Sequence, residues 1–556
     1  MLSNKEVSSL FKTLAGLMEL HGENDFKTKS YSNAAFQLGR LNKPVLQMTD
    51  EELDQAPGIG KSVITKIHEL KATGTIQVLE DLYQVTPPGI IEILGVKGLG
   101  GKKVAVIWKE LGVETIGELL YACNENRLVK LKGFGEKTQQ SVIQSIEYYQ
   151  SNLGKFHFAT VAQMADDVIN SIRSATKTNL ISLTGAIRRK CNVIDLIEIL
   201  IGDPEILSFV KTLEFLSIEK EDQNSLSGKI ANEVPFKIYF TDAAIYHYEL
   251  FRTTGSISHV EQIVASLNGK SDFSTEEEIY TSAGLDFISP EFREEGINFS
   301  ILKQSEIITS EDIKGVVHNH STWSDGKNTL EEMVKGCIEK GFSYFVISDH
   351  SKTAVYAGGL REDQIIAQHK EIDELNKKYP AFKIFKSIEC DILYDGRMDY
   401  DDSVLKTFDL VIASVHQNLK MDEEKATARL LSAIENPYTT ILGHMTGRLI
   451  LSRPGYPVNH KKIIDACAAN HVIIEINANP WRLDIDHSYI PYALEKGVMI
   501  SVNPDAHSID GIDDIHWGVT SARKGGLTKQ MTLNAKNLDE FESWLNERKI
   551  KRGIGN

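Results

Sequence analysis

The chain lacks a long apolar run, paired cysteines and a leader-like start. No stretch of its 556 residues approaches the roughly 20 uninterrupted apolar residues of a membrane helix. Residues 1–25 contain no basic region followed by an apolar run and a small-residue cleavage site, so we do not expect export. The five cysteines are scattered and show no Cys-x-x-Cys spacing, which predicts free thiols in a reducing compartment. We therefore expect a cytoplasmic protein without a membrane partner.

Length and charge indicate several domains with different tasks. The chain is longer than a typical domain of roughly 100–150 residues, and 42% hydrophobic and 25% charged residues exclude a disordered chain. Residues 1–150 hold 17 Lys and Arg against 18 Asp and Glu, whereas the remainder holds 44 against 59. Eleven of the 16 histidines lie between His318 and His516. This acidic, histidine-rich half fits bound cations, and it fits an acidic solubilising surface equally well.

A Gly-apolar-Gly turn followed by a lysine occurs three times in the first 150 residues, next to helical patterns such as 62–70 and 138–149. Glycine allows a positive φ and close backbone approach, and the free N–H groups of a helix start suit a phosphate oxygen. A glycine cap between two helices explains one copy, but three copies favour the helix-hairpin-helix module, which binds the DNA backbone without reading sequence. The predicted DNA contacts are Gly58, Gly60, Lys61, Gly98, Gly100, Lys102, Gly133, Gly135 and Lys137.

Residues 156–304 alternate strand and helix patterns and resemble family X DNA polymerases. The resemblance rests on Thr184-Gly185-Ala186-Ile187-Arg188-Arg189, the strand pattern 193–201, Thr253-Thr254-Gly255-Ser256, and residues 277–294, which resemble the end of the palm domain in bacterial members. It extends from the first glycine turn to near the C-terminus. It implies a nucleotidyltransferase-like palm and thumb, with Arg188, Arg189 and the Gly255-Ser256 turn as phosphate contacts.

The palm carboxylates that this family uses are missing from their expected positions. The family holds two Mg²⁺ ions with Asp-x-Asp on one strand, where alternate residues share a face, and a third Asp on a neighbouring strand. Here the pair falls on Leu196 and Glu198, Asp195 faces the opposite side, and strand 234–240 offers Lys237. We expect an intact palm fold without a catalytic Mg²⁺ site; a one-residue register shift that restores Asp195 is the alternative. The degenerate site comprises Gly185, Arg188, Asp195, Glu198, Gly255 and Ser256.

Seven apolar, β-branched runs fill the C-terminal half, at 315–320, 344–350, 382–389, 410–416, 440–444, 472–477 and 498–507. Most connections carry helical patterns, such as 330–340 and 362–378. Alternating strands and helices predict a parallel sheet, and polar residues at C-terminal strand ends are typical of a β/α-barrel active site. Six of the seven runs end in His, Asp or Glu, which favours a metal site over unrelated core histidines. We predict a (β/α)7 barrel.

Two of these runs end in pairs that suit a metal ion. His318-x-His320 places two imidazoles on one strand face, and Asp505-x-His507 repeats the arrangement. In order and spacing, these and the other strand-end motifs resemble the polymerase-and-histidinol-phosphatase (PHP) domain. The resemblance implies a trinuclear metal site, which is also the catalytic site, made by His318, His320, Asp325, His350, Glu389, His416, His444, Asp505 and His507.

The metal ions implied by this resemblance are three divalent transition-metal ions, Mn²⁺ and/or Zn²⁺, with Fe²⁺ as a further option, and no Mg²⁺ at the palm. Glu389 is the best candidate for a carboxylate shared between ions. Arg448 is added to the catalytic set as a phosphate contact, and Arg453 and Lys352 are further candidates for such a contact. For each of these three cations, a surface or packing role is the alternative.

We predict a multidomain α+β and α/β chain of four parts. They are a helical 8-kDa-like domain with a helix-hairpin-helix (1–82), a fingers-like helix-hairpin-helix pair (83–152), a degenerate family X palm and thumb (153–304) and a PHP barrel (305–556). The resemblance implies a monomeric, nucleoid-associated 3′–5′ exonuclease in base-excision repair, acting on gapped, nicked or recessed DNA ends. Alternatives are a bifunctional gap-filling polymerase with exonuclease and abasic-site cleavage, a PHP-type small-molecule phosphatase, or a non-catalytic DNA scaffold with structural metal.

Overall fold

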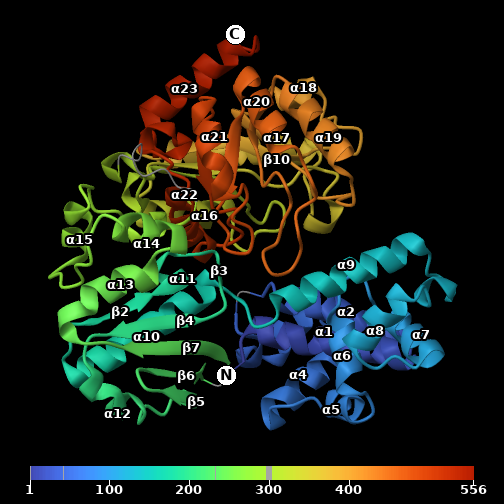
Figure 1. Cartoon of the computed structure of the whole chain (residues 1–556). Helices are drawn as coiled ribbons and strands as arrows, with labels where there is room; N and C mark the ends of the chain where they lie inside the picture. Colours follow the sequence, from blue (N-terminus) through green and yellow to red (C-terminus); the bar gives the residue numbers. More distant parts are fainter. Residues whose placement is uncertain (1, 42, 232, 296–303, 556) are drawn as a thin grey trace. The chain divides into compact units, whose positions relative to one another are not determined.

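The computed structural model describes residues 2–41, 43–231, 233–295 and 304–555 (Figure 1). The chain forms two compact units, Met1–Leu153 and Gly154–Asn556. The first unit is helical, and the second contains a small two-stranded sheet and two larger sheets of different topology.

The first unit packs around the amphipathic helix α1. This helix begins at a capping box between Ser3 and Glu6 and ends at Gly22, whose φ of 73° terminates it in the left-handed conformation. Its apolar residues recur every three or four positions and are buried against the other helices. The helices are α1 (Asn4–His21), α2 (Asp25–Leu38), α3 (Asp50–Gln55), α4 (Lys61–Thr73), α5 (Gln77–Gln84), α6 (Pro88–Gly95), α7 (Gly101–Leu111), α8 (Ile116–Asn124) and α9 (Glu136–Asn152).

The three glycine turns connect helices as predicted. They join α3 to α4, α6 to α7, and the short helix η2 (Leu128–Lys130) to α9. The first glycine of each turn has a φ between 75° and 90°, which an L-residue adopts only with strain. The second glycine is the N-cap of the following helix, and the central residues Ile59, Leu99 and Phe134 are buried. The apolar residue therefore anchors each hairpin while the glycines and the lysine stay at the surface.

The second unit begins with a five-stranded mixed sheet in the order β2-β4-β7-β6-β5. The predicted strand 193–201 is interrupted in the structure, which corrects that prediction: Asp195 and Leu196 lie between β3, which pairs with β1, and β4, which pairs with β2 and β7. The strands are β1 (Phe156–His157), β2 (Ile181–Thr184), β3 (Val193–Ile194), β4 (Ile197–Ile201), β5 (Leu216–Asp222), β6 (Ser225–Ile230) and β7 (Val234–Phe240). The helices are α10 (Phe158–Thr176), α11 (Gly185–Arg188), α12 (Leu207–Val210), α13 (Tyr246–Thr254), α14 (Ile257–Val264) and α15 (Glu276–Ser282).

The other larger sheet of this unit is a nearly closed parallel barrel of seven strands in sequence order, as predicted. A parallel bridge between Asn319 and Ala506, with His320 N donating to Ala506 O at 2.9 Å, brings the first and last strands together. Most strand residues are buried on both faces, which explains the continuous apolar runs. The strands are β8 (Gly315–Asn319), β9 (Tyr344–Ile347), β10 (Lys383–Asp391), β11 (Leu410–Ser414), β12 (Thr439–Leu442), β13 (Ile473–Asn477) and β14 (Ile500–Asn503).

Helices surround this barrel (Figure 1). They are α16 (Leu330–Glu339), α17 (Glu362–Lys378), α18 (Asp402–Leu405), α19 (Glu423–Glu435), α20 (His460–Asn470), α21 (Ile490–Glu495), α22 (Ile515–Lys524) and α23 (Leu538–Lys551). Phe541 of α23 packs on Tyr344, at the start of β9, with ring centroids 4.5 Å apart. An apolar cluster thus fills the amino end of the barrel and leaves polar groups at its carboxyl end. Within the described part of the chain, no helix combines the length and apolar character needed to cross a bilayer.

Buried ion pairs join the mixed sheet to the barrel within the second unit. Lys524 of α22 has a side chain only 1% exposed, and its ammonium donates to Glu294 at 2.8 Å and to the carbonyl of Arg189 at 3.0 Å. Nearby, Arg523 donates to Glu291 at 2.8 Å. Breaking a buried pair leaves an uncompensated charge, so these contacts favour the packing of α22 against residues 189 and 291–294.

We predict that Gly101→Ala loosens the packing of α7 on α1. A Cβ at this position would lie 2.7 Å from the carbonyl oxygen of Gly16 and 2.8 Å from the backbone nitrogen of Leu20. Overpacking of this kind costs about 1–3 kcal/mol. Hydrogen exchange of the α1 and α7 amides should accelerate by roughly five- to 150-fold, which is the factor that this free energy corresponds to. Gly100→Ala is the matched control, since its Cβ would meet only a side-chain oxygen of Glu19 at 3.5 Å; equal exchange in both variants would contradict the account.

Candidate metal centre and nucleic-acid contacts

All nine predicted metal ligands lie close together at the carboxyl end of the barrel. They come from β8 and the loop after it, from β10, and from the ends of β9, β11, β12 and β14. Eight have side chains exposed by 10% or less, and His507 is the exception at 37%. Sequence therefore identified residues that the fold brings together from almost 200 positions apart.

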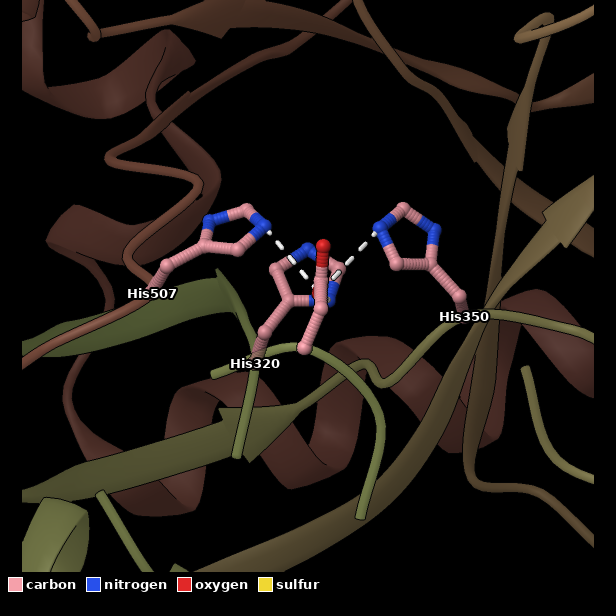
Figure 2. A group of neighbouring side chains, drawn as sticks. His320, His350 and His507 are labelled. Carbon is pink, nitrogen blue, oxygen red and sulfur yellow. Dashed lines mark ion pairs between the residues drawn. The ribbon is translucent and has the colours of Figure 1, made fainter. Parts of the chain in front are cut away.

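The ligand atoms form four overlapping groups in which all atoms lie within 4.8 Å of one another. The groups are His320, Asp325, His350 and His507; His318, Glu389 and His444; His318, His320 and Asp505; and His350, Glu389 and His416. Figure 2 shows the imidazoles of His320, His350 and His507 directed toward one shared point. Overlapping groups of N and O donors are the arrangement that a cluster of divalent ions requires.

Glu389 lies at the centre of the cluster. Its Oε1 is 3.2 Å from His318 Nε2, 3.1 Å from His416 Nε2 and 2.9 Å from His444 Nε2. Its other oxygen lies 2.9 Å from His350 Nδ1. Because both oxygens face different histidines, this carboxylate has the position expected of a group shared between two ions.

The backbone brings the His-x-His and Asp-x-His pairs together differently from the prediction. His318 has a φ of 65°, and the register of β8 against β9 shifts between Val316 and Asn319, so the strand bulges at the ligand. Asp505 likewise has a φ of 53° beyond the end of β14. Strand alternation is therefore not what aligns these side chains. Left-handed backbone at a non-glycine residue costs about 1–3 kcal/mol and persists where the surroundings impose it.

Two carboxylates that the sequence analysis did not select orient the histidines. His318 Nδ1 lies 2.6 Å from Glu475 Oε2, and His416 Nδ1 lies 2.6 Å from Asp391 Oδ1. Such contacts fix which ring nitrogen faces the ion and raise its basicity. Glu475 also accepts the backbone N–H of His444 at 3.0 Å. A buried carboxylate within an apolar run was the signal for Glu475, and Asp391 follows Glu389 by two residues.

The electrostatics of the cluster give its histidines different pKa values. Burial alone would lower the pKa of His416, but Glu389 and Asp391 raise it to about 10. Burial likewise opposes the carboxylates around His507, which raise its pKa to about 9. For His320, burial and the neighbouring imidazoles lower the pKa to about 3. Against the effect of burial, the surrounding imidazoles hold the pKa of Glu389 well below its usual range.

Several donor atoms of the cluster are placed to bind cations but form no hydrogen bonds with one another. In the described ranges, the buried donor atoms without a hydrogen bond of acceptable geometry include His318 Nε2, His320 Nδ1, His350 Nδ1 and Glu389 Oε2. Two of these, His350 Nδ1 and Glu389 Oε2, nevertheless lie only 2.9 Å apart. Buried polar atoms are normally paired, and donors that approach closely without bonding are expected where an ion lies between them.

The predicted phosphate contacts Arg448, Arg453 and Lys352 have protein partners in the structure. Arg448 donates to Asp486 at 2.7 Å and to the carbonyls of Arg482 and Leu483. Arg453 donates to the carbonyl of Gly447. Lys352 pairs with Glu362 at 2.7 Å. For the two arginines these contacts favour the packing alternative. The Lys352–Glu362 pair is solvated, where such pairs are weak, so a phosphate contact by Lys352 stays a prediction.

In the palm-like sheet, Glu198 lies in the region for which the sequence analysis expects a degenerate metal site. Thr184, Glu198 and Lys237 are in register across β2, β4 and β7, so the lysine stands beside the glutamate. A Cβ on Gly185 would lie 1.8 Å from Glu198 Oε2, which shows that this carboxylate covers the glycine, and Tyr239 donates to it at 3.0 Å. Burial raises the pKa of Glu198. Among described residues, every group of three or more potential ligands lies in the barrel.

The other residues predicted for this site have structural partners. Arg188 donates to Glu276 at 3.0 Å and to the hydroxyl of Thr254 at 2.8 Å. Arg189 donates to Glu294 at 3.2 Å. Gly255 ends α13, and Ser256 is the N-cap of α14. Asp195 is exposed in the connection between β3 and β4. The two arginines thus have structural roles in the fold, and their assignment as phosphate contacts stays a prediction.

The predicted DNA contacts of the first unit lie at the start of helices. Lys61 is the first residue of α4, and Lys102 and Lys137 are the second residues of α7 and α9. All three side chains are exposed, and Lys102 forms an ion pair with Asp25 at 3.1 Å in a solvated setting where such pairs are weak. Helix N-termini with free N–H groups and adjacent lysines suit phosphate oxygens.

Family models match three regions of the chain: a helix-hairpin-helix domain at residues 2–76, a SAM-like helix-hairpin-helix tandem at 90–147 and the PHP domain at 317–479. The chain is 34% identical over 570 residues to the DNA polymerase/3′-5′ exonuclease PolX of Bacillus subtilis (strain 168), with 98% of this chain and 99% of the relative covered. Probable phosphatases of Thermoanaerobacter sp. (strain X514) and Caldanaerobacter subterraneus subsp. tengcongensis are 27% and 26% identical. They align over 96% and 93% of their own length but cover 42% and 43% of this chain.

We predict that metal binding releases protons. Because the pKa values of His416 and His507 are about 10 and 9, both imidazoles are protonated at pH 7 without metal. A ligand imidazole must be neutral, so affinity should rise as the pH increases from about 6 to about 9. Calorimetric titration with Mn²⁺ at pH 7, in two buffers of different ionisation enthalpy, should give different heats. Equal heats in the two buffers would contradict the protonated state of these histidines.

Proposed function

The chain belongs to the bacterial family X DNA polymerases that carry a C-terminal PHP domain, and on that premise we propose that its barrel is a metal-dependent 3′–5′ exonuclease. The observation that carries the proposal is the convergence of nine N and O donors at one end of the barrel, in a chain that also contains three helix-hairpin-helix turns. A cluster of this kind suits hydrolysis of a phosphate ester, and the hairpins make DNA the economical substrate.

The cluster's own residues would divide the chemical task. The nine predicted ligands would hold the ions, with Glu389 shared between two of them. Glu475 and Asp391 would keep His318 and His416 in the tautomer that presents a lone pair to the ion. When bound, divalent cations supply the charge that stabilises the pentacovalent phosphorus and lowers the pKa of the attacking water. We propose Mn²⁺ and/or Zn²⁺, with Fe²⁺ as a further option, in three positions.

A small-molecule phosphatase remains the second candidate because the probable phosphatases resemble the barrel. Their alignments cover nearly their full length but less than half of this chain. The remaining part of this chain includes both helix-hairpin-helix regions, which a small phosphate monoester does not need. This difference favours a DNA phosphodiester as the substrate.

We propose further that the chain works as a monomer in the cytoplasm on gapped, nicked or recessed DNA ends in base-excision repair. The four parts at 1–82, 83–152, 153–304 and 305–556 belong to the same proposal, and the separation of the two units after Leu153 supports one of these boundaries. The nine glycines and lysines of the hairpins would bind the DNA backbone.

We predict that the chain shortens a 5′-labelled strand with a recessed 3′ end when Mn²⁺ is present and dNTPs are absent. His318→Ala with His320→Ala should reduce the rate by at least about a hundredfold, since both side chains face the same cluster. His471→Asn is the control, because this exposed histidine lies at the end of α20 with a φ of 51° that Asn tolerates. Undiminished shortening by the double variant would refute the assignment.

We predict no templated incorporation at a one-nucleotide gap with Mg²⁺ or Mn²⁺. The palm offers Glu198 beside Lys237, and a lysine repels the cation that a third carboxylate would hold. The assay should use the His318→Ala, His320→Ala variant, so that exonuclease action does not mask extension. Primer extension that Asp195→Ala abolishes would overturn this reading and favour the bifunctional polymerase.

A further inference from the structure

One arginine at the mouth of the metal cluster has only a long ion pair with a neighbouring carboxylate and no side-chain hydrogen bond among the described residues. Arg482, in the loop after β13, has Nε 3.8 Å from Asp505 Oδ2 and a side chain 21% exposed. Its guanidinium makes no hydrogen bond within the described ranges, in contrast to Arg448 and Arg453. The backbone that carries it is held firmly, since its carbonyl accepts from Arg448 at 2.8 Å and Trp481 O accepts from the N–H of Ile450 at 2.6 Å. A guanidinium that makes no hydrogen bond, on a backbone that is held in place, is suited to bind an incoming anion.

One aromatic side chain lies beside the same mouth. Tyr356, in the short helix η9 (Val355–Ala357) after β9, is 56% exposed, and its ring centroid is 6.3 Å from that of His350. Its loop is tightly built, because the N–H of Leu360 donates to His350 O at 2.8 Å and a Cβ on Gly359 would lie 1.8 Å from Ser351 O. The exposed ring on this well-packed loop is therefore available to a ligand at the cluster.

Tyr356 and Arg482 face the cluster from two different loops. Burial and the carboxylates of Asp391, Glu389 and Asp325 raise the pKa of Tyr356, whereas Arg482 acts in the opposite direction. The phenol therefore lies within electrostatic reach of both the cluster and the guanidinium. Tyr356 lies next to His350, and Arg482 lies next to Asp505. A phosphate bound at the cluster would therefore have the guanidinium on one side and the tyrosine ring on another.

We propose that Tyr356 and Arg482 form the subsite for the terminal nucleotide, with the tyrosine ring stacking on its base and the guanidinium contacting its phosphate. This proposal rests on the proposed exonuclease function and deepens it. Stacking tolerates any base, because every base presents a π-face, and it requires a base that is free of its neighbour. Bidentate donation by arginine matches the oxygens of a phosphate ester. The stacking contact would not help a small ester that lacks an aromatic group, whereas the arginine contact would serve any phosphate ester.

Equilibrium binding of two probes to the Mn²⁺-loaded full chain tests the subsite. The probes are thymidine 5′-monophosphate, which has a base, and inorganic phosphate, which has none. A stacked base contributes about 1–3 kcal/mol, which corresponds to roughly five- to 150-fold in affinity. We expect Tyr356→Ala to weaken nucleotide binding by at least about tenfold while Tyr356→Phe retains it, because the ring and not the hydroxyl makes the contact.

The matched control for the ring is Tyr394→Ala. Tyr394 is 57% exposed in the loop after β10, and Lys425 Nζ lies 4.3 Å from its ring centroid. This variant should bind both probes like the unmodified chain. Arg482→Gln should weaken both probes by roughly tenfold, and Arg482→Lys should recover part of that loss through its charge.

Several results would overturn the subsite. They are a nucleotide that binds no better than phosphate, a Tyr356→Ala variant that resembles Tyr394→Ala, or an Arg482→Gln variant with unchanged affinity for both probes. The strand-shortening assay judges the exonuclease separately. A chain that shortens DNA but binds the nucleotide independently of Tyr356 refutes the subsite alone. A chain that binds the nucleotide through Tyr356 but leaves DNA intact supports the subsite and refutes the nuclease.

Discussion

The carboxylate of Glu389, buried among four imidazoles, is the constraint on which the rest of the barrel depends. Each of the four rings has a nitrogen within 3.2 Å of it. Burying so many polar groups is unfavourable unless protons or cations lie between them. Without metal, protons on His416 and His507 meet part of this need, and bound cations would displace them. The bulge at His318 and the contact of its ring with Glu475 orient this imidazole toward the centre of the cluster.

Much of the barrel and of its cluster could be predicted from sequence because both depend on short patterns of neighbouring residues. Strands buried on two faces must be continuously apolar, and each ends in the polar residue that faces the mouth. The glycine turns were equally readable, since φ values of 75° to 90° demand glycine and the central Phe134 must be buried. Glu475 escaped notice because its partner His318 lies 157 positions away, and only the closed barrel brings them together.

The cations whose roles are hardest to predict from sequence share a physical feature, which is competition for charged groups inside the fold. Arg448, Arg188 and Arg189 looked like phosphate contacts in the sequence, but each has a carboxylate partner in the structure. No sequence motif marks Arg482, yet among the described residues its guanidinium lies beside the cluster with only a 3.8 Å ion pair to Asp505. A local pattern shows that a cation is present, whereas its availability depends on distant neighbours. The interruption at Asp195 is similar, because strand pairing with β1 and β7 decides where β3 and β4 separate.

Elemental analysis of the full chain and of Glu389→Gln, purified in parallel without chelator and resupplied with manganese, tests the central claim most directly. Removing one carboxylate charge from the middle of the cluster should disrupt two ligand groups at once. The account predicts transition-metal ions retained by the unmodified chain and a clear loss of metal in the folded variant. A folded, unmodified chain that retains no metal after resupply, or an equal metal content in both proteins, would contradict it.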